Sequence, residues 1–98
     1  MKYQLKIRPE ASADIAEAFS WYEDQRPGLG PEFEEELSRT FGYMIDMPLG
    51  SRLVHRGMRR ALMHRFPFSV YYSVSGDLVE VRAVFHYRRH PRTWLRRA

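Results

Sequence analysis

The chain has no cysteine among its 98 residues, and this absence excludes both a disulfide framework and a thiolate metal site. No stretch approaches the roughly 18 uninterrupted apolar residues of a membrane span. The N-terminal MKYQLKIRPE has no apolar signal-peptide core, and the four histidines are not spaced as metal ligands within one element. We therefore expect one cytoplasmic domain over residues 1–98, with no metal, no cofactor and no membrane partner.

Lysine is also scarce, and charges of opposite sign dominate the two halves of the chain. Residues 1–49 hold 5 Lys+Arg and 10 Asp+Glu, a net charge of −5. Residues 50–98 hold 11 arginines, no lysine and 2 acidic residues, a net charge of +9 within the overall +4. Because the guanidinium fork suits phosphates and carboxylates, the second half predicts a phosphate-rich or acidic partner. The alternative is an ordinary solvated face that uses arginine in place of lysine.

The first half of the chain shows one strand pattern followed by two helix patterns. Residues 2–8 alternate between apolar and polar side chains, which is typical of a half-buried strand. Apolar residues spaced by three and four predict helices over 10–25 and 31–47. The breaker sequence at 26–30, Arg-Pro-Gly-Leu-Gly, separates them. A connection this short predicts an antiparallel helix hairpin.

The second half shows strand patterns over 58–66, 68–75 and 78–86, and residues 92–97 predict a single helical turn. The complete order is β-α-α-β-β-β with a short C-terminal tail. We therefore predict an α+β fold in which the helix hairpin packs on one face of a largely antiparallel sheet.

Gly76-Asp77 is typical of a two-residue hairpin turn, and it sets the pairing of the last two strands. Ser75 then faces Leu78. The pairs that point into the core are Tyr72–Val81, Val70–Ala83 and Phe68–Phe85. The opposite face is expected to contact water, and it carries Tyr71 opposite Arg82, together with Ser69, Ser73, Glu80, Val84 and His86.

Several short segments, spread over roughly residues 2–94, form a recognisable set. They are Pro9-Glu10-Ala11, Asp14-Ile15, Trp21-Tyr22-Glu23, Arg26-Pro27-Gly28-Leu29-Gly30, Gly57-Met58-Arg59-Arg60, Arg65-Phe66-Pro67-Phe68, Val70-Tyr71-Tyr72 and Val84-Phe85-His86-Tyr87-Arg88-Arg89. Together with the element order, these segments resemble the RelE/ParE superfamily of toxins from type II toxin–antitoxin modules, on its ParE-like side.

This resemblance implies a toxin that arrests growth and is neutralised by a cognate antitoxin. Some members of the superfamily cut messenger RNA on the ribosome without a metal, and others inhibit DNA gyrase. We expect gyrase inhibition, because the catalytic lysines of the RNA-cutting members have no counterpart here; the only lysines are Lys2 and Lys6. A ribosome-dependent mRNA endoribonuclease is the alternative, and a non-toxic nucleic-acid-binding or regulatory module is a further one.

The endoribonuclease alternative needs a proton carrier and a cation beside one phosphate. The His86-Tyr87 pair resembles the ending of some RNA-cutting members, and Arg65 resembles their phosphate-binding arginine. The resemblance thus implies that His86 is the acid or base, that Arg65 stabilises the developing charge, and that Tyr87 orients or stacks. The guanidinium chemistry itself makes Arg65 and Arg82 candidates to clamp the phosphate in a bidentate manner.

Other basic and aromatic residues of the second half are candidates for contact with the target. They are Arg59, Arg60, Tyr71, Arg88 and Arg89. For the antitoxin we expect three kinds of site: the exposed edge of the sheet, which can accept an added strand, an apolar groove of the helix hairpin, and the arginine-rich sheet, which an acidic segment can cross.

Overall fold

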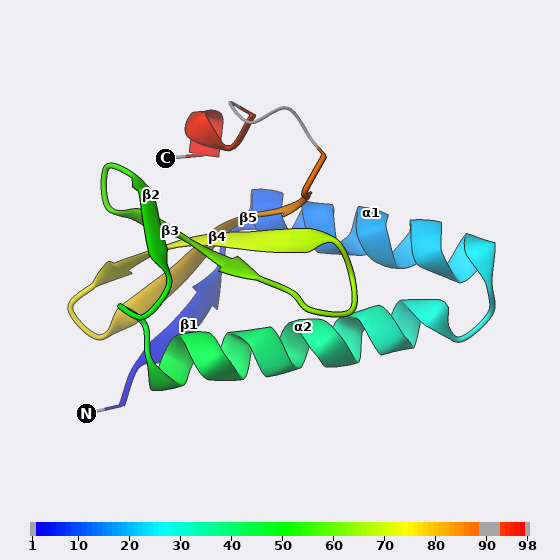
Figure 1. Cartoon of the computed structure of the whole chain (residues 1–98), viewed down its shortest axis with the longest axis horizontal. Coiled ribbons are helices and arrows are strands. Elements are labelled where there is room, and N and C mark those ends of the chain that lie inside the picture. Colours follow the sequence, from blue (N-terminus) through cyan, green and yellow to red (C-terminus); the bar gives the residue numbers. More distant parts are fainter. Residues whose placement is uncertain (1, 89–92, 98) are drawn as a thin grey trace.

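The computed structural model describes residues 2–88 and 93–97 (Figure 1). This part of the chain contains two α-helices and five strands, and its α+β architecture confirms the predicted fold class. The elements in chain order are β1 (Gln4–Ile7), α1 (Pro9–Gln25), α2 (Leu29–Asp46), β2 (Arg52–His55), β3 (Met58–Leu62), β4 (Phe68–Ser75), β5 (Leu78–His86) and the 3₁₀ helix η1 (Thr93–Arg97).

The five strands form one sheet in the order β1-β5-β4-β3-β2. β1 runs parallel to β5, and the other neighbouring strands are antiparallel. The sequence pattern does not predict β2, because four residues with the single apolar pair Leu53-Val54 give too little alternation. β2 forms because the turn at Arg56-Gly57 brings it back onto β3. Both turn residues have positive φ, 32° and 80°, as the preferred hairpin turns require.

The main core lies between the helix hairpin and one face of the sheet. Phe33 of α2 is fully buried at its centre, and its ring lies 5.2–5.5 Å from the rings of Tyr22, Phe66 and Phe68. Such a cluster buries a large apolar area, and its stacked and edge-on ring geometry adds specificity. The sheet residues buried against the helices are Val70, Tyr72, Val79, Val81 and Val84.

A β-bulge shifts the register halfway along the β4–β5 hairpin. Residues 72–75 pair with residues 78–81 in the predicted register. The pairs beyond the bulge are Tyr71–Ala83, Val70–Val84, Ser69–Phe85 and Phe68–His86. The predicted pairs Val70–Ala83, Phe68–Phe85 and Tyr71–Arg82 are therefore wrong, because Arg82 is an extra residue in β5.

The bulge also reverses the faces of β5 beyond Arg82, since one inserted residue moves every later side chain to the other side of the sheet. Val84 packs in the main core, and His86 lies beside Phe68 on the helix side, with ring centroids 5.4 Å apart. Ala83 and Phe85 instead join a second apolar cluster. The prediction that Ala83 and Phe85 face the helices, and Val84 and His86 face water, is wrong.

The joint between the helices is held by Glu23, near the end of α1. Its carboxylate accepts backbone N–H groups of Gly28 at 3.1 Å and of Gly30 at 3.0 Å, so it satisfies two donors at the start of α2. Gly28 has φ 92°, which favours glycine. A Cβ on Gly30 would lie 2.9 Å from the Phe19 ring. These contacts explain the Pro-Gly-Leu-Gly breaker in physical terms.

Replacing Glu23 with alanine is expected to lower the free energy of unfolding by about 1–2 kcal/mol, the usual range for losing an N-terminal helix cap. Urea denaturation measures this change. Asp24→Ala is the matched control, because Asp24 is the exposed neighbour on the same turn. Equal losses in the two variants would contradict the capping role of Glu23.

Candidate functional site

The sheet face turned away from α1 and α2, here called the outer face, is not the open surface that the sequence predicts. Met58, Tyr71, Ala83 and Phe85 are buried there as a second apolar cluster. The 3₁₀ helix η1 lies across the sheet from α2 (Figure 1), and its Arg97 lies over the Phe85 ring of this cluster. Tyr71 is thus only 7% exposed. The predicted fully solvated face is wrong, because the bulge adds Ala83 and Phe85 to apolar residues that need a cover.

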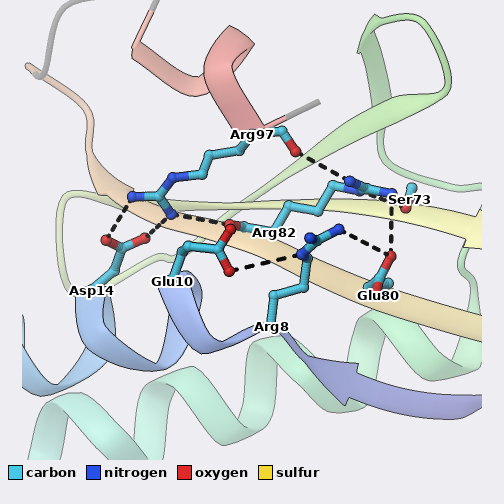
Figure 2. A network of polar contacts seen from close by, with 7 residues as sticks. All are labelled: Arg8, Glu10, Asp14, Ser73, Glu80, Arg82 and Arg97. Carbon is cyan, nitrogen blue, oxygen red and sulfur yellow. Dashed lines mark hydrogen bonds and ion pairs between the residues drawn. The ribbon is translucent and has the colours of Figure 1, made fainter.

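A polar network fastens η1 to the edge of β5 (Figure 2). The Arg97 guanidinium donates to the two carboxylate oxygens of Asp14 at 2.9 and 3.3 Å and to the Arg82 carbonyl at 3.1 Å. It also lies over the Phe85 ring, 5.0 Å from the centroid. Asp14 in turn accepts the Val84 N–H at 3.1 Å.

The chain's own topology explains why this network exists. β1 pairs with β5 only as far as Ile7 and Val81, so among the described residues no strand lies beside the later part of that β5 edge. Asp14 and Arg97 supply the acceptor and the donor that a strand would offer to Val84 and Arg82. Nothing in the local sequence pattern marks this pair, because Asp14 and Arg97 lie 83 residues apart.

The side chain of Arg82, a predicted phosphate clamp, is engaged within the protein. Its Nε donates to the Ser73 hydroxyl at 2.9 Å, and one terminal nitrogen donates to the Arg97 carbonyl at 3.2 Å. The other terminal nitrogen lies 3.1 Å from the Glu80 carboxylate, which also lies 4.0 Å from Arg8. The guanidinium of Arg82 therefore holds the outer face and the tail together.

His86, the predicted acid or base, lies on the opposite side of the sheet from Arg82. The Arg88 backbone N–H donates to its Nδ1 at 3.0 Å. His86 borders a groove of about 470 Å³ between α1 and the ends of β4 and β5. The other lining residues are Asp14, Glu17, Ala18, Trp21, Tyr22, Pro67, Phe68 and Val84.

Arg65, the second predicted clamp, is bound to α2. Its guanidinium donates to the Glu32 carboxylate at 2.5 Å and lies 5.3 Å from the centroid of the Phe66 ring. The hydrogen bond from Arg65 holds the pKa of Glu32 below its ordinary value, with help from the charges of Arg26 and Arg65. The same bond raises the pKa of Arg65.

Replacing Arg65 with alanine is expected to return the pKa of Glu32 toward its ordinary value. Because the folded-state pKa of Glu32 is lowered, the contact stabilises the fold at pH values above the ordinary carboxyl pKa. That contribution is lost as the pH falls through the lowered value. An NMR titration of the Glu32 carboxyl measures the shift. An unchanged titration in the variant would contradict the contact, and Arg39→Ala is the control because Arg39 pairs with Glu35.

Tyr87, Arg60 and Arg88 form the part of the predicted site that remains accessible, here called the Tyr87 surface. The Tyr87 hydroxyl donates to the Met63 carbonyl at 2.5 Å, yet 47% of the residue is exposed. Burial raises the pKa of Tyr87, and the nearby charge of Arg60 opposes that rise. Arg88 follows directly and is exposed. The surface thus combines an aromatic ring with the nearby charge of Arg60 and the exposed arginine that follows in the chain.

The other predicted contact residues have different surroundings. Arg59 lies opposite Leu53, and its guanidinium donates to the carbonyls of Leu49 at 3.2 Å and Ser51 at 2.8 Å. Arg59 therefore stabilises the connection between α2 and β2. Arg89 lies outside the described residues.

The residues predicted for catalysis thus occupy separate places. Arg65 is bound to α2, Arg82 to the outer face, and His86 to the helix-side groove, while Tyr87 is at the end of the sheet. Their catalytic role stays a prediction. Within residues 2–88 and 93–97, no group of three or more acidic or histidine side chains could hold a metal ion. In the same part of the chain, neither α-helix has the apolar length needed to cross a bilayer.

Comparison with known proteins gives a family match over most of the chain. The model of the family described as "ParE toxin of type II toxin-antitoxin system, parDE" matches residues 5–91. Among curated proteins, no sequence matches.

Solved structures share the fold at low sequence identity. The chromosomal ParDE TA system from P. aeruginosa contains a chain with 18% identity and a TM-score of 0.77, with 87% of this chain and 96% of that one covered. A chain of the toxin–antitoxin complex RelBE2 from Mycobacterium tuberculosis has 17% identity and a TM-score of 0.61, with 88% of this chain and 99% of that one covered. A chain of the E. coli DinJ-YafQ toxin–antitoxin complex has 12% identity and a TM-score of 0.62, with 89% of this chain and 94% of that one covered.

Proposed function

Since the chain belongs to the ParE toxin family of type II toxin–antitoxin systems, we propose that it arrests growth by inhibiting DNA gyrase and that a cognate antitoxin neutralises it. The proposal is one of inhibition by binding, without a chemical step on nucleic acid. The similarity to chains from three toxin–antitoxin systems supports the antitoxin as a partner.

The observation that carries this proposal is the separation of the candidate catalytic groups. Cleavage of RNA needs a proton carrier and a cation within a few ångströms of one phosphate. Arg65 and Arg82 are each held by a carboxylate of this chain, Glu32 and Glu80. His86 lies on the other side of the sheet from Arg82. A catalytic arrangement would require both ion pairs to break, whereas binding requires neither.

The Tyr87 surface is the proposed contact with the target. Within residues 2–88 and 93–97, neither Arg60 nor Arg88 takes part in an ion pair; the charge of Arg60 acts on the half-exposed Tyr87, and Arg88 is the exposed next residue. The +9 of residues 50–98 favours encounter with an acidic protein surface or with a DNA-bound complex. An aromatic ring flanked by arginines is also a common composition for the energetic centre of an interface.

Inducible expression with and without the neighbouring gene tests the proposed function. We expect growth arrest without the neighbour, relaxed plasmid DNA and a DNA-damage response, and rescue when the neighbour is co-expressed. Messenger RNA cut in frame with the codons, with supercoiling unchanged, would replace gyrase with the ribosome as the target. Normal growth would favour the non-toxic nucleic-acid-binding module.

One observation favours the second candidate, a ribosome-dependent mRNA endoribonuclease. His86 borders a groove of about 470 Å³, and an imidazole at such a place can serve as a proton carrier for a ligand bound there. In that case His86→Ala abolishes growth arrest, whereas gyrase inhibition by binding survives this change.

A further inference from the structure

We infer that the outer edge of β2, with the apolar patch beside it, is the docking site for an extended, acidic segment of the antitoxin. The inference rests on the proposed function, because it takes the antitoxin as the partner. The inference adds two points to that function: the antitoxin binds at the β2 edge, and its binding segment is extended and acidic.

The apolar patch consists of Tyr43, Met47, Leu49 and Leu53, here called the β2 patch. Each of these residues is more than half exposed. Tyr43 and Met47 lie one turn apart at the end of α2, and Leu49 follows in the connection to β2. Leu53 pairs with Arg59, whose guanidinium reaches the Leu49 carbonyl, so the strand and the connection meet on one side. Four large apolar side chains that are each more than half exposed, all within residues 43–53, point to an interaction surface.

The edge beside this patch is open to a further strand. β2 is the last strand of the sheet order, so its outer edge has no neighbouring strand in the described part of the chain. Figure 1 shows β2 at the margin of the sheet, directly after the end of α2. An unpaired edge offers backbone donors and acceptors to an extended segment, and side chains beside the edge then select the sequence that binds.

The charge around β2 selects an acidic partner. Between Met47 and Gly76 the chain has no aspartate or glutamate, and it has five arginines. Arg52 and Arg56 are the exposed arginines at the two ends of β2. A segment that alternates carboxylates with apolar side chains would place the carboxylates near these arginines and the apolar side chains on the β2 patch.

The backbone at Arg56 gives a separate reason to assign binding to this corner. Arg56 has φ 32°, and it is the one non-glycine residue with positive φ in the described part of the chain. Asparagine and glycine adopt this conformation more readily than arginine does. Strained residues of this kind tend to persist where their side chains have a function. Arg56 thus places a cation in the turn at a position where asparagine or glycine would give a more stable fold.

The test uses the protein encoded by the neighbouring gene as the probe, with full-length toxin variants. Arg56→Asn is expected to raise Tm by about 2–6 °C, since it relieves the backbone strain, and to weaken binding roughly 3- to 10-fold. Leu53→Asp is expected to weaken binding by about 30-fold or more, since it places a carboxylate in the β2 patch. On binding, the backbone amides of β2 should exchange more slowly with solvent.

Arg26→Asn is the matched control, because it makes the same charge change at the joint between the helices, far along the molecule from β2 (Figure 1). It should leave the affinity unchanged. Wild-type affinity in both Arg56→Asn and Leu53→Asp, or no slowing of amide exchange in β2, would overturn the inference while leaving the proposed function intact. A toxin homodimer that Leu53→Asp dissociates would also overturn it. If the wild-type toxin itself does not bind the probe, the proposed function fails.

Discussion

Replacing Asp14 with alanine is expected to lower the free energy of unfolding by about 2–4 kcal/mol, which lowers Tm by roughly 10–25 °C in a domain of this size. The side chains of Asp14 and Arg97 are 11% and 23% exposed, so water screens their ion pair only partly. The change also leaves the Val84 N–H without its acceptor, and an unsatisfied buried donor costs about 1–3 kcal/mol by itself. Thermal and urea denaturation measure the loss.

Two companion variants separate the parts of this effect. Asp14→Asn keeps an acceptor for Val84 but removes the charge, so it should cost less than Asp14→Ala. Arg97→Ala should also cost less, because Asp14 retains the Val84 N–H. Arg96→Ala is the control, since Arg96 is exposed on the same short helix. If Arg96→Ala is as destabilising as Arg97→Ala, the network in Figure 2 does not hold the tail.

Reversing both charges of the Tyr87 surface, Arg60→Glu with Arg88→Glu, is expected to weaken inhibition of gyrase by about 100-fold. Like charges brought together at an interface cost several kcal/mol, and 100-fold corresponds to about 2.7 kcal/mol. Supercoiling assays with purified gyrase measure the change in inhibitory concentration. The free energy of unfolding of the double variant should stay close to that of the wild type, because neither Arg60 nor Arg88 forms an ion pair within residues 2–88 and 93–97.

The matched control reverses two arginines at the helix hairpin, Arg26→Glu with Arg39→Glu, and so changes the net charge equally. This variant should inhibit gyrase as the wild type does. Equal losses in the two double variants would mean that overall charge, rather than the Tyr87 surface, determines inhibition.

The sequence pattern predicts much of the fold because its signals are local. The helix stripes, the breaker at residues 26–30 and the Gly76-Asp77 turn each depend on a few neighbouring residues, and the structure confirms the helices and the first part of the hairpin. β2 escapes prediction because it is short and basic. The bulge at Arg82 escapes prediction because pairing β4 with β5 without a bulge also gives a regular alternation of apolar and polar residues in the sequence.

The candidate site is less accessible to sequence reasoning, because its contacts join distant parts of the chain. Arg65 and Arg82 have guanidinium groups that suit a phosphate. Whether such a group is available to a phosphate depends on carboxylates from distant parts of the chain, which the local sequence does not reveal. Glu32 and Glu80 decide that question here. The Asp14–Arg97 pair spans nearly the whole chain and has no spacing signature. The position of His86 follows from the bulge, so an error of one residue moved it to the wrong face.

The proposed inhibition of gyrase by binding requires no chemistry at His86. Supercoiling inhibition by purified His86→Ala toxin tests it most directly, alongside growth arrest by the same variant. We expect inhibition within about threefold of wild type and undiminished growth arrest. Loss of a general acid or base costs about 10²- to 10⁴-fold in rate. A loss of activity of that size, with cleaved messenger RNA in cells expressing the wild type, would contradict the account.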